Sequence, residues 1–180
     1  MPNYYYDGSL DGLLTVIFKA YEHKNEIIRV HPETEQLTLG LDDIHITTDF
    51  DEARRVEKTI CKKLSKDFLH CIRTCFLSCE KNKDTVIVYS VYKAISSSEK
   101  IINSMDMYGF LMRKMVRRVL NERHKYLGVL RFREMKDKTL FSTIEPKNNI
   151  LPLLLSHFRN RMKKEKFAIF DKNRKMIAYY

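Results

Sequence analysis

The chain has 180 residues and a mass of 21.5 kDa, with 44% hydrophobic and 31% charged residues. This composition excludes a disordered chain, and no apolar run reaches the ~18 to 20 residues of a transmembrane helix, so we expect a globular protein with no membrane partner. The first residues lack the basic and apolar regions of a signal peptide, which makes the expected location cytoplasmic. A chain of this length buries a core without metals or disulfides, and we expect residues 1–180 to form a single domain.

The net charge of +10 is unevenly distributed along the chain. Residues 1–60 carry 6 Lys and Arg against 12 Asp and Glu, a net of −6, whereas residues 61–180 carry 27 against 11, a net of +16. The last two thirds therefore favour a polyanionic partner. A solvated Lys-rich face gives the same composition, so charge alone does not decide between these two interpretations.

Local patterns predict a strand, a helix and an acidic connector at the start of the chain. The aromatic run Tyr4–Tyr6 precedes a turn, and apolar residues then recur at helical spacing, with Asp7 or Ser9 as the candidate N-cap. Asp49 or Asp51 is the candidate N-cap of a later helix. The elements expected in this half are a strand at 4–6, a helix at 9–23, a connector at 27–41, a strand at 44–48 and helices at 52–66, 67–80 and 84–98.

The second half changes from helical spacing to alternation of apolar and polar residues. Its expected elements are a helix at 101–123, strands at 129–135 and 140–144, a helix at 150–162 and a hairpin of strands at 167–170 and 176–179. Pro146–Asn149 is expected to be a turn that ends in an N-cap. The order predicts an α+β fold, in which an antiparallel sheet of the C-terminal ββαββ and the N-terminal strands is covered by several helices.

A basic segment between Arg113 and Lys138 holds ten Lys and Arg against three acidic residues. Arginine pairs with phosphate oxygens through two nitrogens, and aromatic side chains stack on bases, so the segment favours nucleic acid. No helix-turn-helix, zinc-finger or RNA-recognition signature is present. The residues expected to bind nucleic acid are Arg117, Arg118, Arg123, His124, Lys125, Arg131, Arg133, His157 and Arg161.

A catalytic role is an alternative for four residues, namely His124, His157, Glu122 and Asp171. A histidine among arginines has its charged form disfavoured, so it could act as a base near neutral pH. No spacing identifies a nucleophile or a carboxylate pair. The catalytic residues therefore stay unassigned.

The cysteines Cys71, Cys75 and Cys79 recur every four residues. On a helix the outer two would lie ~12 Å apart along the axis, too far to share one zinc ion. We therefore interpret them as small buried hydrophobic residues and expect no metal and no cofactor.

Several strings resemble a bacterial family of unknown function whose members are described as probable DNA metabolism proteins. The strings are Tyr5–Leu14, Glu122–Lys125 with Leu130–Phe132, Ile144–Pro146 with Asn149–Leu153, His157–Phe158 with Arg161, and Phe170–Asp171 with Arg174. The motif residues among them are Tyr5, Tyr6, Asp7, Gly8, Gly12, Phe132, Pro146, Asn149, Asp171 and Arg174.

The resemblance implies a partner more than an activity. Similar proteins are encoded beside a radical SAM protein of DNA modification or repair, and some are fused to a domain similar to uracil-DNA glycosylase. It also implies a further basic region after the last hairpin, which these 180 residues do not include.

The leading expectation is an accessory DNA-binding protein that acts with a radical SAM partner. The first alternative is an enzyme that acts on a damaged base or a nucleic-acid end with His124 or His157 as general base. The second is a protein adaptor that docks its partner through the Met-rich helix at 101–123 or the acidic first third.

Overall fold

The computed structural model describes residues 2–26, 28–33, 43–96 and 106–180. The chain divides into two compact units. Unit 1 comprises Met1–Phe76 and Glu80–Val116, and unit 2 comprises Leu77–Cys79 and Arg117–Tyr180. Each unit has a hydrophobic cluster of its own. Two compact units can still unfold together, so the single domain expected from the sequence stays a prediction.

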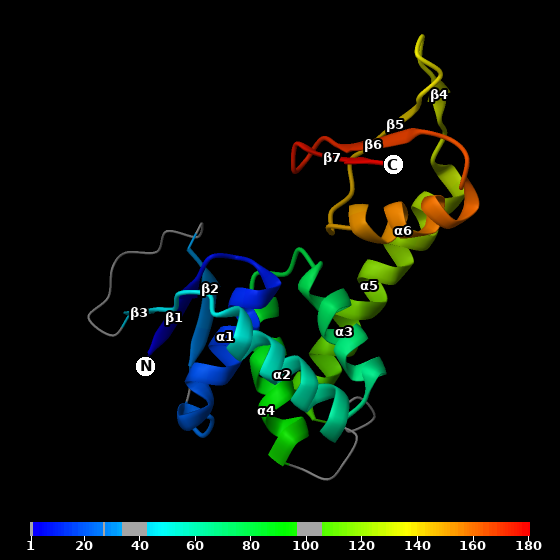
Figure 1. The fold of residues 1–180 in the computed structure, drawn as a ribbon. Helices are drawn as coiled ribbons and strands as arrows, with labels where there is room; N and C mark the ends of the chain where they lie inside the picture. Colours follow the sequence, from blue (N-terminus) through cyan, green and yellow to red (C-terminus); the bar gives the residue numbers. More distant parts are fainter. Residues whose placement is uncertain (1, 27, 34–42, 97–105) are drawn as a thin grey trace. The chain divides into compact units, whose positions relative to one another are not determined.

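Unit 1 is a small parallel sheet with helices packed on it (Figure 1). Its described elements are β1 (Asn3–Tyr6), α1 (Leu10–Lys19), the 3₁₀ helix η1 (Ala20–His23), β2 (Arg29–Pro32), β3 (Asp43–His45), α2 (Phe50–Lys63), α3 (Lys66–Phe76), α4 (Lys83–Ser96) and the first turns of α5 (Met107–Val129). The strand order is β2-β1-β3, and β1 pairs parallel with both neighbours. Tyr4, Tyr6 and Val30 are buried in the cluster that α1 and α4 share with the sheet.

The connector expected at 27–41 is wrong in part, because Arg29–Pro32 forms strand β2. Four residues that end in proline give a weak local signal, and the strand is stabilised by pairing with β1, which lies far away in sequence. Positions 27 and 34–41 of that connector lie outside the described residues, as do positions 97–98 of the helix expected at 84–98 and positions 101–105 of the helix expected at 101–123.

The turn from β1 into α1 explains the motif residues Asp7, Gly8 and Gly12. Gly8 has a φ of +78°, a backbone conformation that favours glycine. The Asp7 carboxylate accepts hydrogen bonds from the Ser9 backbone N–H and the Thr48 hydroxyl, both at 2.8 Å. Burial of the Asp7 carboxyl opposes ionisation, but these hydrogen bonds outweigh it and hold its pKa below the ordinary value. Ser9 is the N-cap, with its hydroxyl accepting from Gly12 N–H.

Gly12 has no room for a side chain. A Cβ atom there would lie 2.2 Å from Asp7 Oδ1 and 2.9 Å from the hydroxyl oxygen of Thr48. The motif at the start of the chain is therefore a packed strand-to-helix turn.

Gly12→Ala should lower the free energy of unfolding by about 1–3 kcal/mol, because the new methyl group overlaps the Asp7 carboxylate. Urea unfolding followed by circular dichroism measures this change. Gly128→Ala is the matched control, since no atom lies within 4 Å of its added Cβ and alanine favours the helix. Equal stability of the two variants would contradict this account of the turn.

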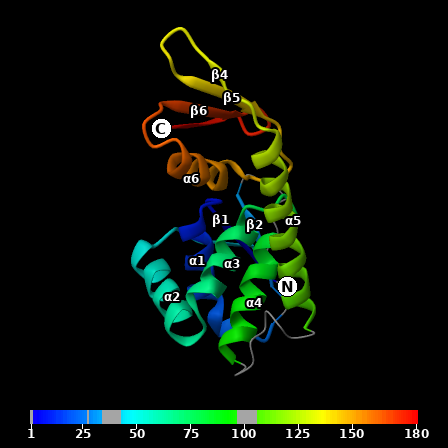
Figure 2. The ribbon, with the colours of Figure 1, turned by 90° about the vertical axis from the view of Figure 1, so that its right-hand side faces the viewer.

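Unit 2 is a four-stranded sheet with one helix packed along one face (Figures 1 and 2). Its described elements are the last turns of α5, β4 (Arg133–Glu134), β5 (Leu140–Ile144), α6 (Leu151–Arg161), β6 (Phe167–Asp171) and β7 (Met176–Tyr179). The strand order is β4-β5-β6-β7. The core residues Ile144, Phe167 and Ile169 face α6, where they meet Leu154 and Phe158.

The mixture of helices and helix-covered sheets confirms the expected fold class, but the strand directions need correction. β4–β5 and β6–β7 are antiparallel, whereas β5 and β6 are parallel because α6 carries the chain back to the starting edge. The N-terminal strands do not extend this sheet; they form their own parallel sheet in unit 1.

The boundary between α5 and the next strand is also shifted. The helix runs to Val129, and only Arg133–Glu134 of the strand expected at 129–135 pairs with β5. Arg131 and Phe132 therefore lie outside the sheet ladder. Leu127 and Leu130 pack against the core of unit 2, which explains why the helix continues this far.

No helix among the described residues is long and apolar enough to cross a membrane.

Candidate nucleic-acid interface

The positive charge of the chain is concentrated in unit 2. Residues 117–180 carry 17 Lys and Arg against 6 Asp and Glu, a net of +11, and Leu77–Cys79 add no charge. The remaining residues carry 16 against 17, a net of −1. All nine residues expected to bind nucleic acid lie in unit 2, so its field is the one that attracts a polyanion.

Four of these residues lie on the exposed side of α5. Arg117, Arg118, His124 and Lys125 are exposed, whereas Val119 of the same helix is buried in the core of unit 2. With 3.6 residues per turn, the four fall within about a third of the helix circumference, and they extend ~12 Å along its axis. They form one basic ridge. Arg123 is half-buried beside it.

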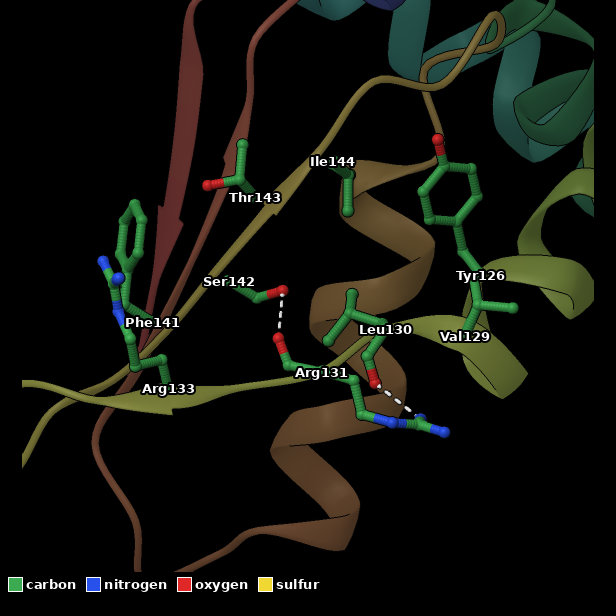
Figure 3. A pocket seen from close by; sticks show the side chains of 9 residues that line it. All are labelled: Tyr126, Val129, Leu130, Arg131, Arg133, Phe141, Ser142, Thr143 and Ile144. Carbon is green, nitrogen blue, oxygen red and sulfur yellow. Dashed lines mark hydrogen bonds between the residues drawn. The ribbon is translucent and has the colours of Figure 1, made fainter.

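A pocket of about 490 Å³ lies where the chain leaves α5 and meets β5 (Figure 3). Two expected nucleic-acid-binding residues, Arg131 and Arg133, line it. The full lining is Tyr126, Val129, Leu130, Arg131, Arg133, Phe141, Ser142, Thr143 and Ile144. The pocket therefore combines two guanidinium groups with an aromatic ring on either side.

The pocket exists because the segment between the end of α5 and Arg133, the first residue of β4, lies outside the sheet ladder. The Ser142 hydroxyl donates to the Arg131 carbonyl at 2.8 Å, which holds this incoming segment beside β5. Arg131 Nη1 donates to the carbonyl of Leu130 at 3.2 Å (Figure 3). It also donates to the carbonyl of Gly128 at 3.2 Å. Because these bonds use one nitrogen, Nε and Nη2 have no acceptor among the described residues and can serve an anion.

Glu122, a catalytic candidate, has a structural role in the described geometry. Its carboxylate accepts from the backbone N–H groups of Lys147 and Asn148, both at 2.8 Å, and from Asn148 Nδ2 at 2.6 Å. The Asn148 side chain in turn accepts from Cys79 N–H at 3.0 Å. Glu122 therefore anchors the loop between β5 and α6 to α5.

Asp171, another catalytic candidate, is fully buried and holds the turn between β6 and β7. It accepts from Asn173 N–H at 3.0 Å and from Arg174 Nη1 at 2.9 Å. Arg174 also donates to the carbonyls of Pro146 and Lys147. Four motif or candidate residues, Glu122, Pro146, Asp171 and Arg174, thus meet in one hydrogen-bond network within unit 2.

The histidine candidates are not brought together with these carboxylates by any described contact. His124 is exposed on the basic ridge, and the half-buried His157 meets the ring of Phe158 edge-on at 5.1 Å. Arg161 is exposed at the end of α6. Tyr5 and Asp7 belong to unit 1, where the Tyr5 ring lies 5.3 Å from His45 and 5.8 Å from His31.

The cysteines do not form one stripe. The helix expected at 67–80 ends at Phe76, so Cys79 lies outside it and is exposed. Burial raises the pKa of the Cys75 thiol to about 12, and its sulfur lies 3.6 Å from the sulfur of Met115. The interpretation as a buried hydrophobic residue is confirmed for Cys75, and it is wrong for Cys79.

Sequence reasoning missed several residues that shape this region. Asn148 was assigned only to a turn, although its side chain joins Glu122 to Cys79. Asn149 does not cap α6, whose N-cap is Ile150. The sequence predicts Phe141 to lie in a strand but gives no sign that it lines a pocket. The alternation along 140–144 does signal that Phe141 and Thr143 share a face opposite the core.

A family model described as a domain of unknown function, DUF4130, matches residues 81–180. The chain belongs to this family. No curated protein and no solved structure matches the chain.

The DUF4130 match covers α4, the described part of α5 and all of unit 2 from Arg117 onward. The network of Glu122, Pro146, Asp171 and Arg174 therefore lies inside the matched region, and the turn at Asp7–Gly12 lies outside it. The family match therefore covers the hydrogen-bond network that holds unit 2 together, and the family description names no activity.

Glu122→Gln should lower the free energy of unfolding by about 2 kcal/mol, because an amide cannot accept from all three N–H donors of the 147–148 loop. Urea unfolding gives the value. Glu134→Gln, at an exposed position of β4, is the control and should stay within about 0.5 kcal/mol of the original. A fully stable Glu122→Gln variant would return Glu122 to the list of catalytic candidates.

Proposed function

We propose that the protein binds nucleic acid through the basic surface of unit 2, as an accessory DNA-binding protein of a repair or modification system. The observation that carries this proposal is the segregation of charge, +11 in unit 2 against −1 in unit 1. A solvated Lys-rich face would need no such segregation. Phosphate contacts supply most of the affinity in complexes of this kind.

The acidic side chains of unit 2 leave most of its cations available. Glu122 and Asp171 are occupied by backbone and side-chain donors within the fold. The ion pairs found in the described part of unit 2 join Lys172 to Glu145 and Arg174 to Asp171. Neither involves Arg117 of the ridge or Arg131 and Arg133 of the pocket, so phosphates would meet three arginines that no carboxylate among the described residues neutralises.

The affinity for a labelled oligonucleotide should fall steeply with salt, with a slope of about −0.7 to −0.9 per phosphate neutralised in a plot of log K against log salt. Reversing two ridge charges, Arg117→Glu with Lys125→Glu, should weaken binding at least tenfold. The salt slope should become shallower by the amount that corresponds to roughly two lost phosphate contacts. Fluorescence anisotropy from 50 to 200 mM salt measures both effects.

The matched control reverses two exposed lysines of α2 in unit 1, Lys58→Glu with Lys62→Glu, which changes the net charge equally. This variant should bind within about twofold of the original, because its charges lie outside the proposed surface. Equal losses in both variants would reduce the effect to net charge, and no binding by the original protein at low salt would end the proposal.

The radical SAM partner belongs to the same proposal and rests on the resemblance of the strings quoted above. Affinity purification after nuclease treatment should retain an iron–sulfur protein of that class, identified by mass spectrometry. Its absence in such preparations would leave DNA binding standing and remove the partner. The enzyme alternative gains no support from Glu122 or Asp171, whose carboxylates hold loops of the fold.

A further inference from the structure

The sheet of unit 2 has a second face that α6 does not cover. Strand register places side chains of this face in two rows that cross the sheet. The first row is Arg133, Phe141, Ala168 and Tyr179, and the second is Thr143, Phe170 and Ile177. No described element of unit 2 packs on this side in either view (Figures 1 and 2).

The side chains of this open face take no part in the core of unit 2. Phe141, Phe170, Ile177 and Tyr179 are absent from its hydrophobic cluster, whereas their strand neighbours Phe167 and Ile169 belong to it. Tyr179 is 63% exposed and Ile177 is 61% exposed. Large apolar side chains held in the open on a rigid sheet indicate a binding surface.

The three aromatic rings of the open face surround a small residue. Phe141 and Tyr179 lie on either side of Ala168 in one row, on strands about 10 Å apart, and Phe170 lies two residues further along β6. No other aromatic ring of the described residues stacks on these three. Tyr179 is exposed and Phe141 and Phe170 are half-buried, so part of each ring is accessible to a planar ligand.

Cations border the same face. Arg133 is in the first row beside Phe141, and the exposed Lys166 and Lys175 lie two residues before Ala168 and Ile177. The pocket is continuous with this face, because Arg133, Phe141 and Thr143 line it as well (Figure 3). Rings on a sheet with cations at its edge complement bases and phosphates together.

We infer that the open face is a stacking platform for single-stranded nucleic acid, with bases on Phe141, Phe170 and Tyr179 and phosphates at Arg131, Arg133 and the bordering lysines. This inference rests on the proposed function and narrows its substrate. In a duplex the faces of the bases are stacked on one another, so a sheet of rings cannot reach them without unstacking. Unpaired bases offer those faces at no such cost.

A labelled thymine 15-mer should bind the full chain at least tenfold more tightly than a hairpin duplex of similar length at 150 mM salt. Phe141→Ala and Tyr179→Ala should each weaken single-strand binding about tenfold while leaving duplex binding and its salt slope within twofold. Tyr179→Phe keeps the ring and should bind like the original protein.

Tyr180→Ala is the matched control, because this neighbouring tyrosine packs on the core residue Phe167, with ring centroids 5.5 Å apart, on the other side of the sheet. It should leave the ratio of single-strand to duplex affinity unchanged. Ultraviolet crosslinking of the thymine 15-mer to the original protein, mapped by mass spectrometry, tests the same platform without any variant and should label Phe141, Phe170 or Tyr179.

The outcomes separate this inference from the proposed function. Binding of both oligonucleotides with no loss in the alanine variants would overturn the platform and keep nucleic-acid binding, and no binding of either would overturn both. A dimer by sedimentation that Tyr179→Ala dissociates, with crosslinks elsewhere, would assign the face to a second copy of the chain and overturn the platform.

Discussion

The carboxylate of Glu122 is the anchor on which unit 2 depends. It accepts three hydrogen bonds from the Lys147–Asn148 loop, and that loop is the point where the chain leaves β5 for α6. Because β6 must run parallel to β5, the chain has to cross over in between, and the start of that crossover needs a fixed position. The Arg174 guanidinium donates to the backbone carbonyl of Pro146 at the start of the same loop, and the Asp171 carboxylate accepts from Arg174 and fixes its position.

This arrangement uses two of the six acidic residues of unit 2, Glu122 and Asp171, inside the fold. Most of its arginines and lysines are exposed, and they outnumber the four exposed carboxylates of Glu134, Asp137, Glu145 and Glu165. The crossover also gives the sheet two unlike faces, one sealed by α6 and one bearing rings. Binding chemistry is thus concentrated on surfaces that the fold does not need for its own stability.

The sequence predicted the elements whose signals are local. Ser9 before an apolar helical pattern located α1, and the alternation along 140–144 located β5 with its observed bounds. It missed β2, because Arg29–Pro32 is stabilised by pairing with the distant β1. Residues 129–135 alternate between apolar and polar side chains, and this alternation predicts a strand. The same alternation also fits the last turn of a helix followed by an irregular segment, which is what the structure contains.

The clustering of positive charge predicted part of the candidate site correctly, whereas the chemical type of single residues was a poor guide to their roles. Arg131 and Arg133 line a pocket, and the sequence could point to them because a cluster of arginines is visible in the sequence itself. Glu122 and Asp171 looked catalytic because no sequence feature tells a reactive carboxylate from one that accepts backbone N–H groups. The rows of the open face follow from the register between strands, which only the folded sheet defines.

The open face also bears on how the protein behaves at high concentration. β7 is an edge strand whose side chains include the exposed Ile177 and Tyr179, a combination that invites copies to adhere. The net charge of unit 2 opposes this, because like charges repel over the Debye length of about 10 Å at 0.1 M salt. Concentrated salt screens that repulsion, so the same ions that release a polyanion also remove the colloidal barrier to precipitation.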